Sequence, residues 1–377
     1  MRNSAAKSLA LTLGGLAGLA SALPATITAR NATTQGSSCP PFNSSTFVIN
    51  QFQLYPENAK FDFQRCVVAL FNASVAVFDP YTNTVTESIT FPGLTGDPSL
   101  HLGPALPDGA GGLTVLLDAA APFSTNGADV SGGNIFIKYD LDTKAVRWQR
   151  NLTAEVSQGR YGGFQDVEHD RDLNVYVVGT FPGTVLRSDK NGENLAEWYV
   201  PPAAQLANTT VAGFAGLAAI PGRDLLLTNN NADGEVYRFD GISTSTTRTP
   251  VKVKRTAADG TTAATSPLGF SDAISLPARY NGTVLLLAED AVGVTVLRSR
   301  DGTWQSAETL GTVSNNVTAA QGGMMPAAVQ IGAEKIFAVQ EFYADTPLVA
   351  GTNAGNRTAF PMVDITAEVD KLFAQAA

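Results

Sequence analysis

The segment Ile135-Phe136-Ile137-Lys138-Tyr139-Asp140 is a run of β-branched and aromatic residues that ends at an aspartate. Such a run predicts a short strand, and the aspartate opens a polar turn that it can stabilise by an Asx-type hydrogen bond. Related segments recur along the chain, and their turn aspartates are 49 to 63 residues apart. The six segments are Val75–Asp79, Ile135–Asp140, Thr184–Asp189, Glu235–Asp240, Val294–Asp301 and the weaker Phe360–Asp364. The spacing indicates six structural repeats.

A more apolar segment precedes each of these strands. Continuous apolar character over four or five residues indicates a strand that is buried on both faces. The six apolar segments are Cys66–Leu70, Leu113–Leu117, Val175–Val178, Leu225–Thr228, Val284–Ala288 and Ile336–Val339. One further short segment precedes each of them, and another follows the aspartate turn. The sequence therefore predicts an all-β fold, a six-bladed β-propeller of four-stranded antiparallel blades that spans residues 46–377.

The last repeat ends soon after Asp364 and lacks its outermost strand. Thr46–Phe52 alternates in the manner of a strand but has no repeat of its own. We expect this N-terminal strand to close the ring by pairing with the last blade, because the pairing removes an exposed sheet edge. Residues 366–376 form the one good helix candidate.

The N-terminal residues 1–22 have the pattern of a secretory signal peptide. Arg2 and Lys7 precede an apolar run with three glycines, and Ala20–Ala22 supplies small residues for cleavage. A leader rich in Ser, Thr and Pro follows over residues 23–45. The run is too short for a membrane-spanning helix, and no later stretch reaches the required length. We therefore predict a secreted, extracellular protein without a membrane span.

Two further patterns fit export. Cys39 and Cys66 are the only cysteines, and in an oxidising compartment they predict one disulfide between the leader and the first blade. Asn-x-Ser/Thr sequons, the acceptors for N-glycosylation, occur about twice as often as chance predicts. The eight sequons are Asn31, Asn43, Asn72, Asn151, Asn208, Asn281, Asn316 and Asn356.

The charge balance argues against nucleic acid as a partner. Without the signal segment the chain has 23 basic and 34 acidic residues, a net charge of −11. Such a surface repels phosphate backbones. The sequence gives no sign of oligomerisation, so a monomer is expected.

Three segments resemble one protein family. They are Tyr55–Asn58, Phe71–Pro80 and Asp170–Val177. They are similar to the trichothecene-cluster protein fourteen of plant-pathogenic fungi and to a major secreted allergen of skin yeasts (Malassezia), over about residues 46 to 370. The resemblance implies a secreted six-bladed propeller linked to fungal secondary metabolism or virulence. It does not imply a set of catalytic residues that can be assigned position by position.

Common catalytic signatures are missing from the chain. It has no Gly-x-Ser-x-Gly elbow, no His-Glu-x-x-His and no nucleotide-binding glycine loop. The chain has two histidines, His101 and His169. His169 stands in a charged turn and is interpreted as a solvated turn histidine.

Counting back from the buried strands places one residue of each repeat at the start of the innermost strand, beside the central channel. The six residues are Glu57, His101, Asp166, Gly216, Asp272 and Ala327. If they converge, like charges should raise the pKa of at least one carboxyl group and suit it to acid/base catalysis. Glu57, His101, Asp166 and Asp272 are therefore the candidate catalytic residues.

Two other interpretations of these residues remain open. Propeller channels are often lined by polar residues only because they contain water. The carboxylates could instead hold Ca²⁺, with Asn229 and Asn230 as amide ligands, as in calcium-dependent six-bladed lactonases. The sequence lacks a clear match to the motif of those lactonases, so the metal is unknown and no cofactor is assigned.

Two long loops favour a ligand site at the same end of the channel. They span residues 118–133 and 341–357 and should bring Phe123, Phe342 and Tyr343 to the channel mouth, beside Glu341. The alternative is that they are disordered surface loops. Apolar walls with a few polar groups are typical of small-molecule sites.

The leading hypothesis is a secreted propeller that binds a small hydrophobic metabolite or lipid at the mouth of its axial channel. A second hypothesis is an enzyme of secondary metabolism that promotes acid/base cyclisation or lactone-type hydrolysis. A third is a non-catalytic surface factor that interacts with a host. The sequence does not identify the ligand.

Overall fold

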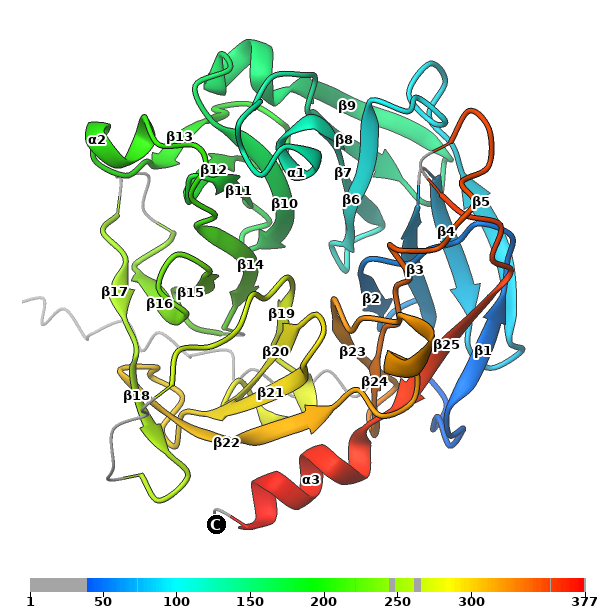
Figure 1. Cartoon of the computed structure of the whole chain (residues 1–377), viewed down its shortest axis with the longest axis vertical. Coiled ribbons are helices and arrows are strands. Elements are labelled where there is room, and N and C mark those ends of the chain that lie inside the picture. Colours follow the sequence, from blue (N-terminus) through cyan, green and yellow to red (C-terminus); the bar gives the residue numbers. More distant parts are fainter. Residues whose placement is uncertain are drawn as a thin grey trace, which may run out of the picture. The chain divides into compact units, whose positions relative to one another are not determined.

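The computed structural model describes residues 39–375, apart from residues 73, 221, 244–247, 261–265 and 353. The predicted signal segment, most of the leader and the Asn31 sequon lie outside the described residues. Six sheets are arranged around a central axis (Figure 1). The innermost strands are β2 (Ala59–Asp62), β6 (Leu100–Pro107), β10 (Gly162–His169), β14 (Phe214–Ala219), β19 (Ile274–Ser275) and β23 (Ala328–Ile331). This confirms the predicted six-bladed propeller.

The first three blades each contain four antiparallel strands in chain order. Blade one consists of β2 (Ala59–Asp62), β3 (Val67–Asn72), β4 (Ser74–Asp79) and β5 (Thr84–Ile89). Blade two consists of β6 (Leu100–Pro107), β7 (Gly112–Ala119), β8 (Ile135–Asp140) and β9 (Ala145–Asn151). Blade three consists of β10 (Gly162–His169), β11 (Val175–Phe181), β12 (Thr184–Ser188) and β13 (Ala196–Tyr199).

The next two blades are less regular. Blade four consists of β14 (Phe214–Ala219), β15 (Leu225–Asn230), β16 (Glu235–Asp240) and the short β17 (Val251–Lys252). Blade five consists of β19 (Ile274–Ser275), β20 (Val284–Glu289), β21 (Gly293–Arg298) and β22 (Ser306–Ser314). It gains a fifth strand, β18 (Lys254–Ala257), which runs parallel to β22 and comes from the connection between blades four and five.

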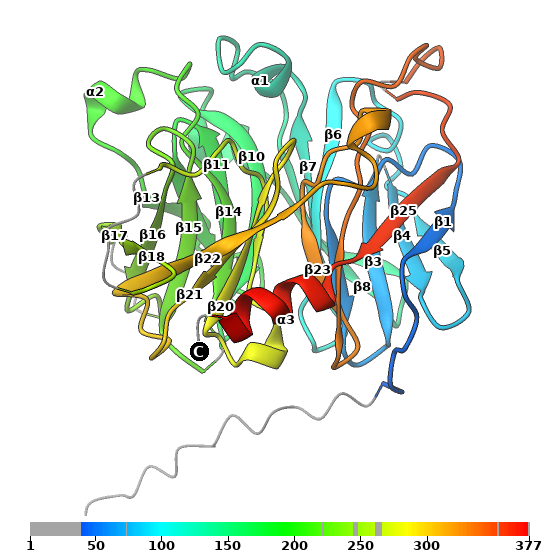
Figure 2. The ribbon, with the colours of Figure 1, turned by 60° about the horizontal axis from the view of Figure 1, so that its bottom comes forward.

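Blade six shows how the ring closes. It contributes β23 (Ala328–Ile331), β24 (Lys335–Ala338) and β25 (Ala359–Asp364), and β1 (Phe47–Asn50) pairs antiparallel with β25. The predicted closure by the N-terminal strand is therefore confirmed. The first and the last strand of the described chain therefore pair in this one sheet (Figure 2).

The few helices lie in connections between strands or at the C-terminal end. Helices α1 (Ala121–Ser124) and α2 (Ala203–Leu206) are single turns, and α3 (Thr366–Gln375) is the predicted C-terminal helix. Val369 of α3 is fully buried, and Leu372 and Phe373 pack against the core shared by blades five and six. Gly311 of β22 has φ +144°, and a Cβ there would lie 2.8 Å from Leu372 Cδ2, so glycine allows the helix to approach the sheet. Helix α3 therefore covers part of the outer side of these blades.

The sequence pattern explains the blade core. The second strands carry the apolar runs, and β7 and β11 are buried along their whole length. The aspartates after the third strands cap their turns as expected. The carboxylates of Asp79, Asp140, Asp189, Asp301 and Asp364 each accept the backbone N–H two residues further on. At the remaining turn, which follows β16 in blade four, Asp240 forms an ion pair with Arg238 at 3.0 Å.

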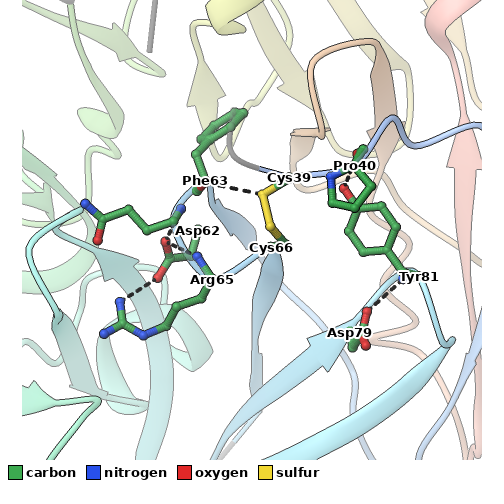
Figure 3. Close-up of a disulfide and its surroundings, with 9 residues drawn as sticks. Cys39, Pro40, Asp62, Phe63, Arg65, Cys66, Asp79 and Tyr81 are labelled. Atoms are coloured by element: carbon green, nitrogen blue, oxygen red, sulfur yellow. Dashed lines mark hydrogen bonds and ion pairs between the residues drawn. A yellow bond between two sulfur atoms is a disulfide. The ribbon is translucent and has the colours of Figure 1, made fainter. Parts of the chain in front are cut away.

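Cys39 and Cys66 form the predicted disulfide (Figure 3). The bond links the segment before β1 to the start of β3, and beside it the Tyr81 hydroxyl donates a hydrogen bond of 2.8 Å to the Pro40 carbonyl. Phe42 and Phe47 pack on Phe337 in the same region. The disulfide therefore joins blade one to the strand that closes blade six.

Replacing both cysteines with alanine should lower the free energy of unfolding by about 3 kcal/mol, because the bond closes a 27-residue loop and restricts the unfolded chain. Urea unfolding of the double variant beside the wild type measures this loss. An unchanged midpoint and slope would show that β1 docking alone holds the closure.

Candidate functional site

One large cavity, of about 600 Å³, opens at the end of the axial channel where the innermost strands begin. Its lining comes from every blade except the fourth, so it is an axial site and not a groove between two blades. The lining residues used below are Tyr55, Glu57, His101, Phe123, Gln165, Thr180, Phe181, Phe270, Asp272, Asp290, Glu341, Phe342 and Tyr343. We call this space the axial cavity.

Four acidic side chains form the floor of the axial cavity. Glu57 precedes β2, Asp272 precedes β19, Asp290 begins the turn after β20, and Glu341 follows β24. We call these four residues the carboxyl floor. They come from three blades and meet only because the propeller brings the ends of these strands to one axis.

A chain of polar contacts connects the carboxyl floor to blade three. The Thr180 hydroxyl donates to Gln165 Oε1 at 2.7 Å, and the Gln165 amide donates to Asp272 Oδ1. Asp272 and Asp290 are neighbours at the floor, and burial together with the negative charge of Asp290 raises the pKa of Asp272. Two adjacent carboxylates repel each other, which favours the protonated form of one of them.

Burial, with the repulsion between neighbouring carboxylates, raises the pKa values of the floor. Burial and the charges of Asp290 and Asp166 raise the pKa of Glu57 to about 7. Burial raises the pKa of Asp290 to about 6. Burial and the neighbouring acids hold the pKa values of Asp272 and Glu341 well above the usual range. The floor therefore exchanges protons near neutral pH.

Glu341 and Asp290 each have one buried carboxyl oxygen, Oε2 and Oδ1 respectively, without a hydrogen-bond partner among the described residues. The Glu341 side chain is 4% exposed. Asp118, behind His101 at the end of β7, likewise has an unpartnered Oδ1 atom and a pKa raised by burial and by the charge of Glu57. Unpaired buried polar atoms are costly, so they mark places where a ligand can supply the missing partner.

Aromatic side chains form the wall of the axial cavity. Helix α1 carries Phe123, whose ring stacks on His101 at a centroid distance of 6.0 Å and meets Phe181 edge-on at 5.7 Å. Phe270 and Tyr343 are 56% and 49% exposed and stand at the rim. Burial lowers the pKa of His101, so this ring is neutral at pH 7. The wall is apolar and without a positive charge.

The long loop of blade six is held in place by a clamp of three residues. Arg357 donates to both carboxylate oxygens of Asp345, at 2.6 and 2.8 Å, and the Tyr55 hydroxyl donates to the same carboxylate at 2.8 Å. The Arg357 guanidinium also lies 3.5 Å from the ring centroid of Phe342. These contacts connect the loop to the segment before β2. The loop that carries Glu341, Phe342 and Tyr343 is therefore anchored at both ends.

The structure separates Asp166 from the other three candidate catalytic residues. Glu57, His101 and Asp272 line the axial cavity, whereas Asp166 lines a void of about 10 Å³ that Glu57 and Asp272 also border. Asp166 accepts the N–H of Leu217 at 2.9 Å. It pairs with Val178, the fourth residue of β11, and the matching residue of blade five is Ile274, which pairs with Leu287. Counting nine residues back from Val175 and twelve back from Val284 placed Asp166 and Asp272 at one level. In the structure Asp272 lies two residues before Ile274, so Asp166 lies two residues further into its blade than Asp272 does.

Four other residues that the sequence singled out do not line the axial cavity. The buried amide of Asn229 donates to the Ser271 hydroxyl at 2.6 Å, and its oxygen accepts from Gly216 N–H at 2.6 Å. The Asn230 oxygen accepts from Ala232 N–H within its own turn. Gly216 and Ala327 are buried against neighbouring strands. The interpretation of Asn229 and Asn230 as ligand contacts therefore has no support from their positions.

The interpretation of His169 as a solvated turn residue is wrong. It ends β10, and its Nε2 atom lies 2.8 Å from the Thr114 hydroxyl of blade two. Burial lowers its pKa to about 3. The charged sequence around His169 suggested exposure, but the neighbouring blade covers this strand end.

Asp290 and Gln165 are site residues that the sequence analysis missed. Both lie beside positions of the repeat pattern, since Asp290 follows the end of a buried strand and Gln165 precedes Asp166. The alternation of side chains near a strand end depends on bulges, so counting residues could not assign them to the cavity.

The carboxyl floor does not have the geometry of a metal centre. Within residues 39–375, outside the gaps given above, no three His, Cys, Asp or Glu side chains are arranged to hold a metal ion.

Among the helices of the described residues, none has the length and apolar character that a membrane span requires.

Comparison with known proteins assigns the chain to a family. It is 34% identical over 355 residues to trichothecene biosynthesis protein 14 of Trichoderma arundinaceum, a match that covers 89% of this chain and 92% of that protein. The chain belongs to the trichothecene cluster protein 14 family. The core trichothecene cluster protein 14 of Fusarium sporotrichioides is 31% identical over 351 residues, 88% of this chain and 87% of that protein. No protein-family model matches the chain.

Solved structures agree with the fold of this protein 14 family member. The major allergen Mala s 1 of Malassezia sympodialis superposes with a TM-score of 0.69 at 18% identity, over 86% of this chain and 96% of that one. Regucalcin, a calcium-binding protein of Agrobacterium tumefaciens, superposes with a TM-score of 0.50 at 11% identity, over 83% and 92%. At these identities the likeness concerns the fold alone.

Proposed function

We propose that this protein binds a small, largely apolar metabolite of fungal secondary metabolism in the axial cavity. The observation that carries the proposal is a cavity of about 600 Å³ with an aromatic wall and a small set of convergent polar groups. Its volume lies in the range of small-molecule sites, and its composition is typical of them. The family supports the connection to secondary metabolism, because both curated relatives are named for the trichothecene cluster.

The wall and the floor have separate tasks in this proposal. Phe123, Phe181 and Phe270 remove the hydrocarbon part of the ligand from water, which provides most of the affinity. The floor supplies hydrogen bonds that orient the ligand. The anchored blade-six loop keeps Glu341 and Phe342 in place before the ligand arrives, so less ordering is required on binding.

A binding screen with terpenoid precursors and lipids tests the proposal. Wild-type protein should retain at least one terpenoid in equilibrium dialysis with mass spectrometry, and Phe123→Ala should weaken that binding by about tenfold or more, because it removes an aromatic ring from the cavity wall. Val146→Ala, a change at an exposed position on outer strand β9, is the matched control and should leave binding unchanged. Failure to bind any small molecule would contradict the proposal and favour a factor that engages host macromolecules.

The raised pKa values of Glu57 and Asp290 favour a second candidate, an enzyme that promotes acid/base cyclisation or lactone-type hydrolysis. A carboxyl group that titrates near neutral pH can both donate and accept a proton during a reaction. In this candidate Glu57 or Asp272 transfers the proton and neutral His101 assists. Turnover of a bound precursor by wild type, lost in Glu57→Gln and Asp272→Asn, is the expected result. Binding without turnover would exclude it.

Export belongs to the same proposal. The disulfide fits an oxidising compartment. Five sequon asparagines, Asn43, Asn208, Asn281, Asn316 and Asn356, are exposed, whereas Asn151 is half-buried and the Asn72 side chain lies outside the described set. We propose a secreted glycoprotein without its first 22 residues. Mass spectrometry of culture-medium protein before and after glycosidase treatment would reveal the mature N-terminus and the occupied sequons.

A further inference from the structure

The carboxyl floor has a charge composition that restricts the ligand, given the proposed function of the axial cavity. Every charged side chain that lines the cavity, within the described part of the chain, is acidic. Arg357 is held outside by Asp345 and by the face of Phe342. His101 is neutral. A bound molecule therefore meets only negative or neutral groups at the floor.

The floor also lacks hydrogen-bond donors of its own in its ionised form. Glu341 Oε2 is buried without a partner, and ionised carboxylates are acceptors only. Gln165 already donates to Asp272 and accepts from Thr180. The groups that remain unsatisfied are acceptors, so a ligand must bring donors to pair with them.

The arrangement of the carboxyl groups favours an organic donor group over a metal ion as the occupant of the floor. A compact metal ion needs three or more ligands within reach of one point, and the described residues provide no such cluster. An organic group on a hydrocarbon skeleton can instead contact one or two carboxylates while its apolar part packs on the aromatic wall. Rings such as Phe270 also attract a cation through their π faces.

We propose that the carboxyl floor selects ligands by charge: it takes a molecule whose polar end donates hydrogen bonds, a protonated amine above all, and it rejects carboxylates and phosphates. The ammonium group pairs with the carboxyl oxygens of the floor, including the unpartnered Oε2 of Glu341 and Oδ1 of Asp290, and an uncharged hydroxyl binds there more weakly. An anion would leave the carboxylates unpaired and add like-charge repulsion.

Three compounds with one skeleton test this selection: 1-adamantylamine, 1-adamantanol and 1-adamantanecarboxylate. Titration calorimetry at pH 8 should give the tightest binding for the amine, about tenfold or more weaker binding for the alcohol, and no detectable binding for the carboxylate. Lowering the pH to 5 protonates Glu57 and Asp290, so the advantage of the amine should shrink.

Substitutions test whether the charge selection depends on the carboxyl floor. Glu57→Gln and Asp290→Asn should weaken the amine about tenfold at pH 8 and leave the alcohol nearly unchanged, because these two carboxyl groups, with pKa values of about 7 and about 6, are ionised at that pH and lose their charge at constant size. Phe123→Ala should weaken the amine and the alcohol alike. Asp172→Asn, on an exposed turn that does not line the cavity, should change neither and is the matched control. Thermal melting of each variant confirms that it is folded.

The results separate this proposal from the one on which it rests. Equal affinity for the amine and the alcohol, or binding of the carboxylate as tight as that of the alcohol, would overturn the charge selection while small-molecule binding stands. Absence of binding by all three compounds would overturn both. The expected order, lost in the floor variants, would support both.

Discussion

Glu57→Gln should raise the melting temperature of the protein at pH 8 and leave it almost unchanged at pH 4. Burial raises the pKa of Glu57 from 4.5 to about 7, so the folded protein binds this proton more tightly than the unfolded chain does. The stabilisation from that proton is complete below the unfolded pKa of about 4.5 and is lost as the pH rises through about 7. At pH 8 the wild type holds an ionised, poorly solvated carboxylate, whereas glutamine is uncharged at every pH.

The expected size of this effect follows from the same values. A pKa raised by about 2.5 corresponds to about 3 kcal/mol of stability lost between pH 4 and pH 8. For a protein of this size, that is a few degrees in melting temperature. Asp290, whose pKa is raised to about 6, should add to the decline between about pH 4 and pH 6.

Differential scanning calorimetry from pH 4 to pH 8 measures the effect. The wild type should lose stability as the pH rises, and Glu57→Gln should flatten the upper part of that curve. Asp172→Asn, at an exposed position, serves again as the control and should follow the wild type. A wild-type curve that rises toward pH 8, with Glu57→Gln parallel to it, would show that Glu57 is solvated and not part of a buried floor.

Deleting residues 39–51 should abolish cooperative folding of the propeller at 25 °C. The deletion removes β1, which pairs with β25 through all four of its residues, and leaves β25 as an exposed edge. It also removes Phe42 and Ile49, which are 2% and 1% exposed, and each contributes about 2 to 3 kcal/mol by burial. With the disulfide lost as well, the total approaches the whole stability of a typical domain.

The double cysteine variant is the matched control for this deletion. It lacks the disulfide but retains β1, so it should stay folded with a reduced midpoint in urea. Near-ultraviolet circular dichroism and urea unfolding compare the two proteins. A deletion variant that unfolds cooperatively near the midpoint of the double cysteine variant would contradict closure by β1.

The axial site was only partly predictable, and the reason lies in particular residues. Glu57, His101 and Asp272 were expected at the channel mouth and line the cavity there. Asp166 was expected beside them but lies two residues deeper, because the turns between the first and second strands differ in length in a way that residue counting did not allow for correctly. Asp290 was missed because nothing in its local sequence distinguishes it from a turn aspartate.

The local structure of this protein is encoded in its sequence patterns. The apolar runs predict the buried second strands, the aspartates predict most of the turns, and the alternating segment before Tyr55 predicts the closing strand. These features depend on neighbours in the chain, so their patterns are visible in one dimension. Which side chains share the axial cavity depends on the folded arrangement of the blades, since Glu57, Asp290 and Glu341 are far apart in sequence. Their raised pKa values arise from burial and mutual repulsion, and both exist only once the blades close around the axis.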